Sequence, residues 1–489
     1  MMKGYCLKWM SCVVLLALFC PAMRADDPAE AEKLIQGSEL YDLCKTMAAP
    51  EFSGRLSGDA GYTKAARWAA GRFAEWGLRP IDTRAGFLQA YPSPYSVVES
   101  AELTVILPAA AEGKDTAPAR LQAELAKDFL PLVFSDSGEA RAAAAVFCGW
   151  GISAPEIGYD DYAGIDARGR FVLCFRGTPD AKENRYQVHD EHRSRMRTAK
   201  GKGALGIVYI YDTVQINPNG DVLAAFTPLM ISEAFTDRLL KAEGFSCGQL
   251  KRDLLAYRRP LSFPLPVRFD YRVKSRVDAA GIGYNVAGWI EGSDPGLRRE
   301  VVVLGAHFDA CGAHLGLLFP GADDNASGSS VVLGAAKAAA ALGVKPKRSV
   351  LFVLFGGEEK GLQGSTWFAG HLPEPFTRVT AMLNFDMEGE GDRAGVAVSA
   401  LPENLKEAIL RADDSRKTLT ATRVLDPPGV RGSDFAPFFL QGVPCAAFWS
   451  NGPHIEYHSP GDTIYRINPD ILADIARLAF RAACQVADL

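Results

Sequence analysis

Apolar runs of strand length alternate with stretches of helical spacing from about Tyr284 to the C-terminus. Such alternation is typical of crossover units, in which the strands run parallel and helices cover both faces of the sheet. This part of the chain therefore predicts a three-layer α/β/α sandwich around a mixed, mostly parallel sheet. The expected strands are Val301–Ala306, Val350–Phe355, Thr380–Asp386 and Ala446–Trp449, and the expected helices are 327–342, 361–372, 403–412 and 470–487.

Residues 129–270 have a different pattern, in which short apolar runs are separated by turns rich in glycine and aspartate. The runs Ala144–Phe147, Phe171–Phe175 and Gly206–Ile210 predict a smaller, β-rich α+β module. A stretch rich in alanine and proline at 108–118 is a candidate junction before this module.

The first 25 residues have the layout of a secretory signal. Lys3 and Lys8 precede an apolar run from Met10 to Phe19, and Ala25 offers a small residue for cleavage. We therefore expect an exported protein, periplasmic or extracellular, cleaved near Ala25. The apolar run is shorter than the roughly 20 residues that span a bilayer, and no later run is long enough, so no transmembrane span is expected.

Composition argues against a small disulfide scaffold and against a nucleic-acid-binding surface. The chain has 489 residues, of which 48% are hydrophobic and 23% charged, as in folded proteins of two or three domains. Its net charge of −5 and the lack of a basic block argue against nucleic acid as a partner. Beyond the expected leader the cysteines are odd in number, so at least one thiol is free and no disulfide is assigned. They are Cys44, Cys148, Cys174, Cys247, Cys311, Cys445 and Cys484.

Histidine and carboxylate residues gather where the expected strands of the C-terminal part end. In open α/β sheets, ligands and substrates bind at the carboxyl ends of the strands. Imidazole and carboxylate ligands together suit Zn²⁺. The candidates are His307 with Asp309, the pair Asp323 and Asp324, the pair Glu358 and Glu359, Asp386, and His458.

The charges of this set favour two zinc ions over one. Ionised Asp323, Glu359 and Asp386 supply three negative charges, and a bridging hydroxide would balance the four positive charges of two ions. His307 and Asp309 stand two residues apart on a strand and face the same side. We therefore expect Asp309 to accept the second imidazole N–H of His307.

The motifs that carry these residues resemble those of the zinc-dependent exopeptidases of the M28 type, in a form with an inserted protease-associated (PA) domain. The matching motifs are Gly305–Asp309, Gly321–Gly328, Phe355–Ser365, Asn384–Met387 and Tyr457–Thr463. Two early segments are similar to the family's opening helix region and three to its PA module. These are Gly54–Gly58 and Gly77–Pro80, and Tyr159–Asp166, Gly169–Gly177 and Ala204–Tyr209.

The resemblance also implies how the chain is divided into domains. The expected parts are a signal peptide at 1–25, the N-terminal part of the peptidase domain at 26–115, an inserted PA-like domain at 116–275 and the catalytic domain at 276–489. The sequence does not indicate an oligomeric state.

The resemblance implies a role for each ligand candidate. Asp323 would bridge two zinc ions. His307 and Asp386 would complete one site. Glu359 and His458 would complete the other.

Three further residues receive roles in the same way. Glu358 would be the general base. Tyr457 matches a position at which several family members hold an oxyanion-stabilising tyrosine, and simple packing is the alternative. The family's cis peptide after its bridging aspartate would here be Asp323–Asp324, with structural support as the role of Asp324.

These roles imply a secreted aminopeptidase that releases N-terminal residues from peptide substrates by two-zinc hydrolysis. One alternative is a glutaminyl cyclase of the same fold, which uses one zinc ion. A carboxypeptidase is another. It would require a basic pocket, which no arginine in the motif segments clearly supplies, although Arg431 and Arg466 lie close in sequence. A non-catalytic binding protein is the third, although such relatives lose the base or the ligands and this chain has kept them. His314, His371 and His454 match no ligand position, and we expect surface or hydrogen-bonding roles for them.

Overall fold

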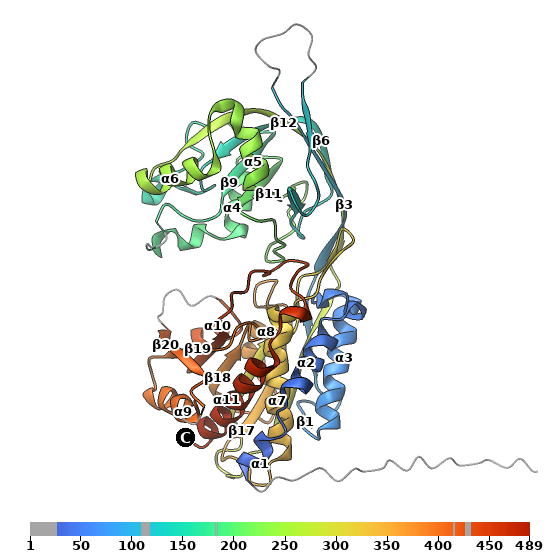
Figure 1. The fold of residues 1–489 in the computed structure, drawn as a ribbon, viewed down its shortest axis with the longest axis vertical. Coiled ribbons are helices and arrows are strands. Elements are labelled where there is room, and N and C mark those ends of the chain that lie inside the picture. Colours follow the sequence, from blue (N-terminus) through green and yellow to red (C-terminus); the bar gives the residue numbers. More distant parts are fainter. Residues whose placement is uncertain (1–26, 109–117, 181, 183, 414–415, 426–431) are drawn as a thin grey trace, which may run out of the picture.

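Two lobes, each built around its own sheet, make up the protein (Figure 1). The computed structural model describes residues 27–108, 118–180, 182, 184–413, 416–425 and 432–489. The expected signal peptide at 1–25 lies outside the described residues. Among the residues that are described, no helix is long and apolar enough to cross a membrane.

The larger lobe contains a nine-stranded mixed sheet. Its strands are β1 (Arg79–Pro80), β2 (Leu88–Pro92), β13 (Ile282–Ile290), β14 (Glu300–His307), β17 (Ser349–Phe355), β18 (Arg378–Phe385), β19 (Ala394–Ser399), β20 (Leu419–Leu425) and β21 (Cys445–Ser450). Their order is β1-β13-β17-β14-β18-β21-β19-β20, with β2 also paired to β13. The four strands from β17 to β21 run parallel, whereas β13 and β19 lie antiparallel to this central set.

Helices cover both faces of this sheet. Alternate residues of a strand point to opposite faces, so Val302 and Leu304 of β14 pack on one side and Val301 and Val303 on the other. The first face is covered by α1 (Pro28–Glu32), α2 (Gly37–Met47), α3 (Ala60–Glu75), α7 (Gly328–Ala341), α9 (Glu403–Asp413) and α11 (Pro469–Ala487). The second is covered by α8 (Gln363–Gly370) and α10 (Ala436–Leu440). The prediction of a three-layer α/β/α sandwich is therefore confirmed.

The central helix of the first face is α7. It consists mainly of alanine, glycine, serine and valine, and most of its residues are buried. A helix that is apolar all round belongs inside a protein, and α7 packs between the sheet, α2 and α11. Because α7 directly follows the helical turn Ala322–Ser327, its burial anchors that turn at the edge of the sheet.

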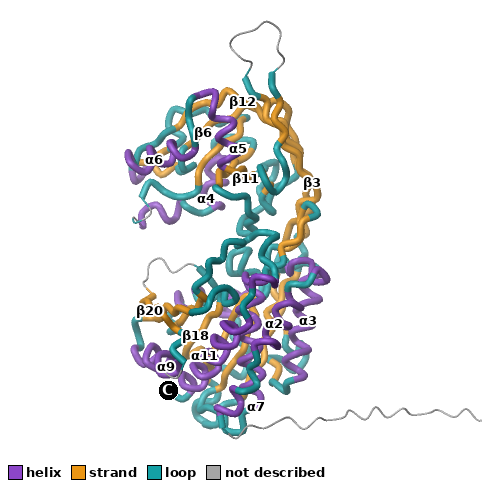
Figure 2. The backbone as a smooth tube through the Cα atoms, viewed as in Figure 1, coloured by secondary structure: helices purple, strands orange, loops and turns teal. Residues whose placement is uncertain are grey.

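The smaller lobe contains an eight-stranded sheet and three α-helices. Its strands are β3 (Tyr95–Ile106), β4 (Arg120–Gln122), β5 (Phe129–Pro131), β6 (Gly138–Cys148), β9 (Arg170–Phe175), β10 (Gly206–Tyr211), β11 (Leu229–Ser232) and β12 (Ser262–Asp278), and its helices are α4 (His192–Gly201), α5 (Glu233–Leu240) and α6 (Cys247–Tyr257). The strand order is β4-β3-β12-β6-β9-β10-β11-β5. The long antiparallel pair of β3 and β12 joins the lobes (Figure 2). The chain leaves the larger sheet after β2 through β3 and returns through β12 to β13, so the smaller lobe is an insertion.

Short elements complete the described chain. The remaining strands are β7 (Ser153–Ala154), β8 (Tyr159–Asp160), β15 (Gly312–His314) and β16 (Leu317–Phe319). The other helical turns are Pro50–Arg55, Pro155–Ile157, Asn184–His189, Lys241–Glu243 and Ile464–Arg466.

All four strands expected in the C-terminal part are present, as β14, β17, β18 and β21, and the four expected helices are α7, α8, α9 and α11. The pattern missed β19 and β20, which extend the sheet beyond β21. Of the expected domain boundaries, the one at 115–116 lies outside the described residues. The one at 275–276 falls within β12, close to its end at Asp278.

Candidate metal centre

The carboxyl ends of β17, β14 and β18, which are neighbours in the sheet, bring distant side chains together. His307 is the last residue of β14, Glu359 follows β17, and Asp386 follows β18. The helical turn before α7 adds Asp324, and the loop after β21 adds His458. Because the three strands are parallel and in register, their ends lie at one edge of the sheet.

One group of ligand atoms forms around His307. The Nε2 atom of His307 lies 3.1 Å from Oδ1 of Asp324 and 3.3 Å from Oδ1 of Asp386. His307 and Asp324 are buried, and Asp386 is partly exposed. One ligand atom from each residue lies within 4.8 Å of the other two, which is close enough to share a metal ion.

A second group forms around His458. Its Nε2 atom lies 2.9 Å from Oε2 of Glu359 and 3.2 Å from Oδ2 of Asp324. Although buried and close to both carboxylates, Nε2 makes no hydrogen bond of good geometry. An imidazole nitrogen and carboxylate oxygens that converge in this way are better suited to bind a metal ion than to share a proton.

Asp324 faces both groups, with one carboxylate oxygen toward each histidine. The structure differs here from the expectation, which gave the bridging position to Asp323. The carboxylate of Asp462 accepts the main-chain N–H groups of Asp323 and Asp324, at 2.7 and 3.0 Å, and holds this backbone in place. The expected cis peptide is also wrong by one residue, since the cis bond joins Asp324 to Asn325.

The side chain of Asp323 turns instead to His454. The Nδ1 atom of His454 donates to Oδ2 of Asp323 at 2.5 Å, and its Nε2 atom donates to the carbonyl of Ser450 at 3.1 Å. Although burial lowers the pKa of His454, the carboxylate of Asp323 raises it to about 9. Asp323 also accepts the N–H of Gly389. The pair therefore links the turn before α7 to the loop that carries His458.

The ring of each histidine is oriented by a main-chain carbonyl. The Nδ1 atom of His307 donates to the carbonyl of Asp309 at 3.2 Å, while the carboxylate of Asp309, expected in this place, lies 3.7 Å away. The Nδ1 atom of His458 donates to the carbonyl of Ile216 at 2.9 Å, and the N–H of Ile216 donates to the carbonyl of His458 at 3.0 Å. Ile216 belongs to the inserted lobe, so that lobe takes part in orienting a candidate ligand.

Arg55, which was not among the expected site residues, supports the loops of this centre. It is completely buried, and its guanidinium donates to the carbonyls of Phe308 at 2.8 Å, Pro320 at 2.8 Å and Gly321 at 2.7 Å. A fourth bond reaches the carbonyl of Met47. These loops follow His307 and precede the turn of Asp324, so Arg55 fixes their separation. The sequence offers one signal for this role. Arg55 lies within Gly54–Gly58, one of the segments that resemble the family's opening helix region.

Replacing Arg55 by methionine should lower the free energy of unfolding by about 3 kcal/mol or more, because unpaired buried acceptors cost about 1–3 kcal/mol each. Urea unfolding followed by circular dichroism measures this change. Arg67→Met, at an exposed position of α3, is the matched control and should change stability little. Equal stability of the two variants would contradict the role of Arg55.

Glu358 lies at the edge of the centre and lines the adjoining cleft. Its side chain is partly exposed, and its main-chain N–H donates to the carboxylate of Asp309 at 3.1 Å. Burial raises the pKa of Glu358 well above its ordinary value; His307 opposes this shift and Glu359 adds to it. A carboxylate with a raised pKa can accept a proton and return it near neutral pH.

A cleft of about 810 Å³ opens next to this centre, between the two lobes. The larger lobe contributes Glu358, Glu359, Leu362, Pro437, Leu440 and His458, and the inserted lobe contributes Arg176, Asp190, His192, Arg193, Asn217 and Asn219. Tyr457 also lines the cleft, is 43% exposed and stacks on the ring of His458 with centroids 3.8 Å apart. The candidate ligands are thus reached from a space large enough for a peptide end.

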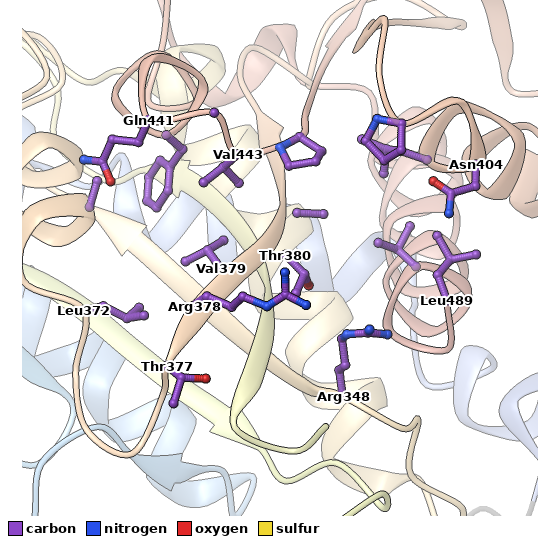
Figure 3. Close-up of a pocket in the computed structure, with 18 residues that line it drawn as sticks. Arg348, Leu372, Thr377, Arg378, Val379, Thr380, Asn404, Gln441, Val443 and Leu489 are labelled. Atoms are coloured by element: carbon purple, nitrogen blue, oxygen red, sulfur yellow. The ribbon is translucent and has the colours of Figure 1, made fainter. Parts of the chain in front are cut away.

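Another cavity, of about 640 Å³, lies near the opposite end of β18 (Figure 3). Arg348, Arg378, Thr380 and Leu372 are among its lining residues, and none of the candidate ligands is. Both arginines are paired with Glu300. This cavity is therefore separate from the candidate centre.

The remaining histidines with no expected ligand role make hydrogen bonds. His314 donates to the carbonyl of Cys311 and His371 to that of Trp367. Of the arginines considered for a basic pocket, Arg431 lies outside the described residues, and Arg466 is paired with Glu390 at 2.6 Å.

Known proteins resemble parts of this chain in sequence. Residues 285–483 match the model of peptidase family M28. A probable leucine aminopeptidase of Trichophyton verrucosum is 33% identical over 204 residues, which cover 40% of this chain and 56% of the relative. Leupeptin-inactivating enzyme 1 of Streptomyces exfoliatus is 28% identical over 237 residues, which cover 42% of this chain and 51% of the relative. The chain thus spans about half the length of these curated relatives.

Solved structures share the fold of both lobes. An aminopeptidase from Aneurinibacillus superposes with a TM-score of 0.63 at 21% identity, covering 93% of this chain and 95% of that one. A zinc aminopeptidase from Bacillus subtilis has a TM-score of 0.58 at 19% identity, covering 92% and 94%. The segment that matches the model of peptidase family M28, residues 285–483, is thus the one that holds the candidate ligands.

Proposed function

We propose that this protein is a zinc-dependent aminopeptidase that removes N-terminal residues from peptides at a two-metal centre. The carboxylate of Asp324, which faces both His307 and His458, is the observation that carries the proposal. One ion would be held by His307, Asp324 and Asp386. The other would be held by Asp324, Glu359 and His458. The names of the relatives, a leucine aminopeptidase and a zinc aminopeptidase, support the same activity.

The donor set fits zinc, because each histidine lies close to two carboxylates and the ligand atoms lie beside an open cleft. Zinc bound there would lower the pKa of a water molecule and polarise the substrate carbonyl. Glu358, at the cleft, would take a proton from that water and return it to the leaving amine. The carbonyls of Asp309 and Ile216 would keep the two imidazoles in the tautomer with Nε2 free for the metal.

Tyr457 is proposed to contact the substrate, since its exposed ring forms part of the cleft wall. A hydroxyl there can stabilise the oxyanion only if it comes within about 3 Å of it. The carboxypeptidase alternative needs a basic pocket. Arg466, one of the two candidate arginines, already forms an ion pair with Glu390.

Export and the inserted lobe belong to the same proposal. We propose cleavage of the leader near Ala25 and a periplasmic or extracellular location. The β-rich lobe is proposed to be a PA-like module that forms one wall of the substrate cleft.

The activity is tested by incubating the zinc-loaded protein with one peptide in free and N-acetylated forms. The products are identified by mass spectrometry. Stepwise loss of N-terminal residues from the free form alone is the expected result. C-terminal loss would support a carboxypeptidase. Loss of ammonia from an N-terminal glutamine peptide would support a cyclase. No mass change from any peptide would support a binding protein.

A further inference from the structure

A buried thiol stands beside the second group of ligand atoms. Cys311 lies four residues after His307 and is 3% exposed. Its Sγ atom lies 3.6 Å from Oε1 of Glu359. Ligand atoms of Cys311, Glu359 and His458 all lie within 4.8 Å of one another, as those of the first group do. The two groups therefore differ in chemistry, because only the one around His458 contains sulfur.

The sulfur of Cys311 lies as far from a carboxylate oxygen of Glu359 as two atoms bound to a common ion do. With Zn–S near 2.3 Å and Zn–N or Zn–O near 2.1 Å, tetrahedral geometry places neighbouring ligand atoms about 3.5 Å apart. The distance of 3.6 Å from Sγ of Cys311 to Oε1 of Glu359, across which the thiol donates a hydrogen bond in this structure, is close to that value. The buried Nε2 atom of His458 has no hydrogen bond of good geometry and points into the same group. That unpartnered nitrogen indicates a ligand between these side chains, since buried polar atoms are nearly always paired.

We propose that Cys311 is a further ligand of the metal ion held by Glu359 and His458. This inference rests on the metal centre proposed above. The S–H bond breaks as the metal–sulfur bond forms, and the proton passes to solvent. Thiolate is a soft ligand that selects zinc over harder cations. The ion at His458 is therefore bound more selectively than the ion at His307, whose group offers imidazole and carboxylates alone.

Cobalt provides the test, because Co²⁺ can replace Zn²⁺ and a Co²⁺–thiolate bond absorbs strongly in the near ultraviolet. The full chain, freed of metal and titrated with Co²⁺, should develop this charge-transfer band together with the weaker visible bands of bound cobalt. Cys311→Ser should lose the near-ultraviolet band and keep the visible ones. Cys484→Ser, which alters a cysteine on α11, is the matched control and should retain both.

Zinc affinity gives a second readout. Competition with a chelator should show one of the two zinc ions bound at least about 10-fold more weakly in Cys311→Ser, on the scale of losses at zinc sites. Cys311→Ala should behave alike, and the circular dichroism spectra of both variants verify that they fold.

The outcomes separate this inference from the proposed function. Bound cobalt without a near-ultraviolet band in the unaltered chain, or a band that survives in Cys311→Ser, overturns the role of Cys311 and leaves the aminopeptidase proposal standing. Failure to bind cobalt overturns the metal centre and with it this inference.

Discussion

Asp324→Asn should deprive the protein of stable two-zinc binding, whereas Asp323→Asn should keep both ions. An amide offers one neutral oxygen, so it can replace at most one of the two contacts that the carboxylate of Asp324 directs at His307 and His458, and it carries no charge. Mutation of residues that merely orient zinc ligands costs about 10- to 100-fold in affinity or activity. Loss of a carboxylate shared by two ions should therefore lower kcat/KM by more than about 100-fold.

Zinc content after dialysis, measured by mass spectrometry, and kcat/KM for a leucyl anilide check this expectation. Asp323→Asn is the matched control, because it makes the same chemical change one residue earlier. It removes the charge that pairs with His454, so a modest loss of stability is expected but two zinc ions should remain. Two ions in Asp324→Asn and fewer in Asp323→Asn would return the bridging role to Asp323.

Glu358→Gln should lower kcat by about 10²- to 10⁴-fold, the range that a general base contributes. Glutamine has nearly the same shape but accepts no proton at neutral pH. Because Glu358 lies outside both groups of ligand atoms, zinc content should stay at two ions per chain and KM should change little.

Steady-state kinetics and zinc analysis of the same preparation measure both quantities. Glu407→Gln, an exposed residue of α9, is the control and should match the unaltered chain. A Glu358→Gln variant that turns over at the full rate would exclude this residue as the base. A variant that loses zinc would place it among the ligands.

The pattern of apolar and polar residues was sufficient to predict the central strands of the larger sheet but not the strands at its edge. β14 and β17 are continuous apolar runs because both faces of a central strand are buried. β19 is built partly from alanine and glycine, which have a low preference for strands. β20 lies at the edge of the sheet, and most of its residues are exposed. Neither segment therefore looks like a strand until its neighbour is known.

The sequence by itself determined the layered α/β architecture and the kinds of ligand at the strand ends. The reason is that the spacing of apolar residues indicates which faces are buried, and the residue types at the strand ends indicate the chemistry. Only the tertiary structure decided which of Asp323 and Asp324 faces both histidines, since adjacent side chains diverge and the carboxylate of Asp462, about 140 residues away, sets the backbone there. It also brought the carbonyl of Ile216 to His458, across 242 residues. Such contacts depend on how two lobes meet, and no local pattern contains that information.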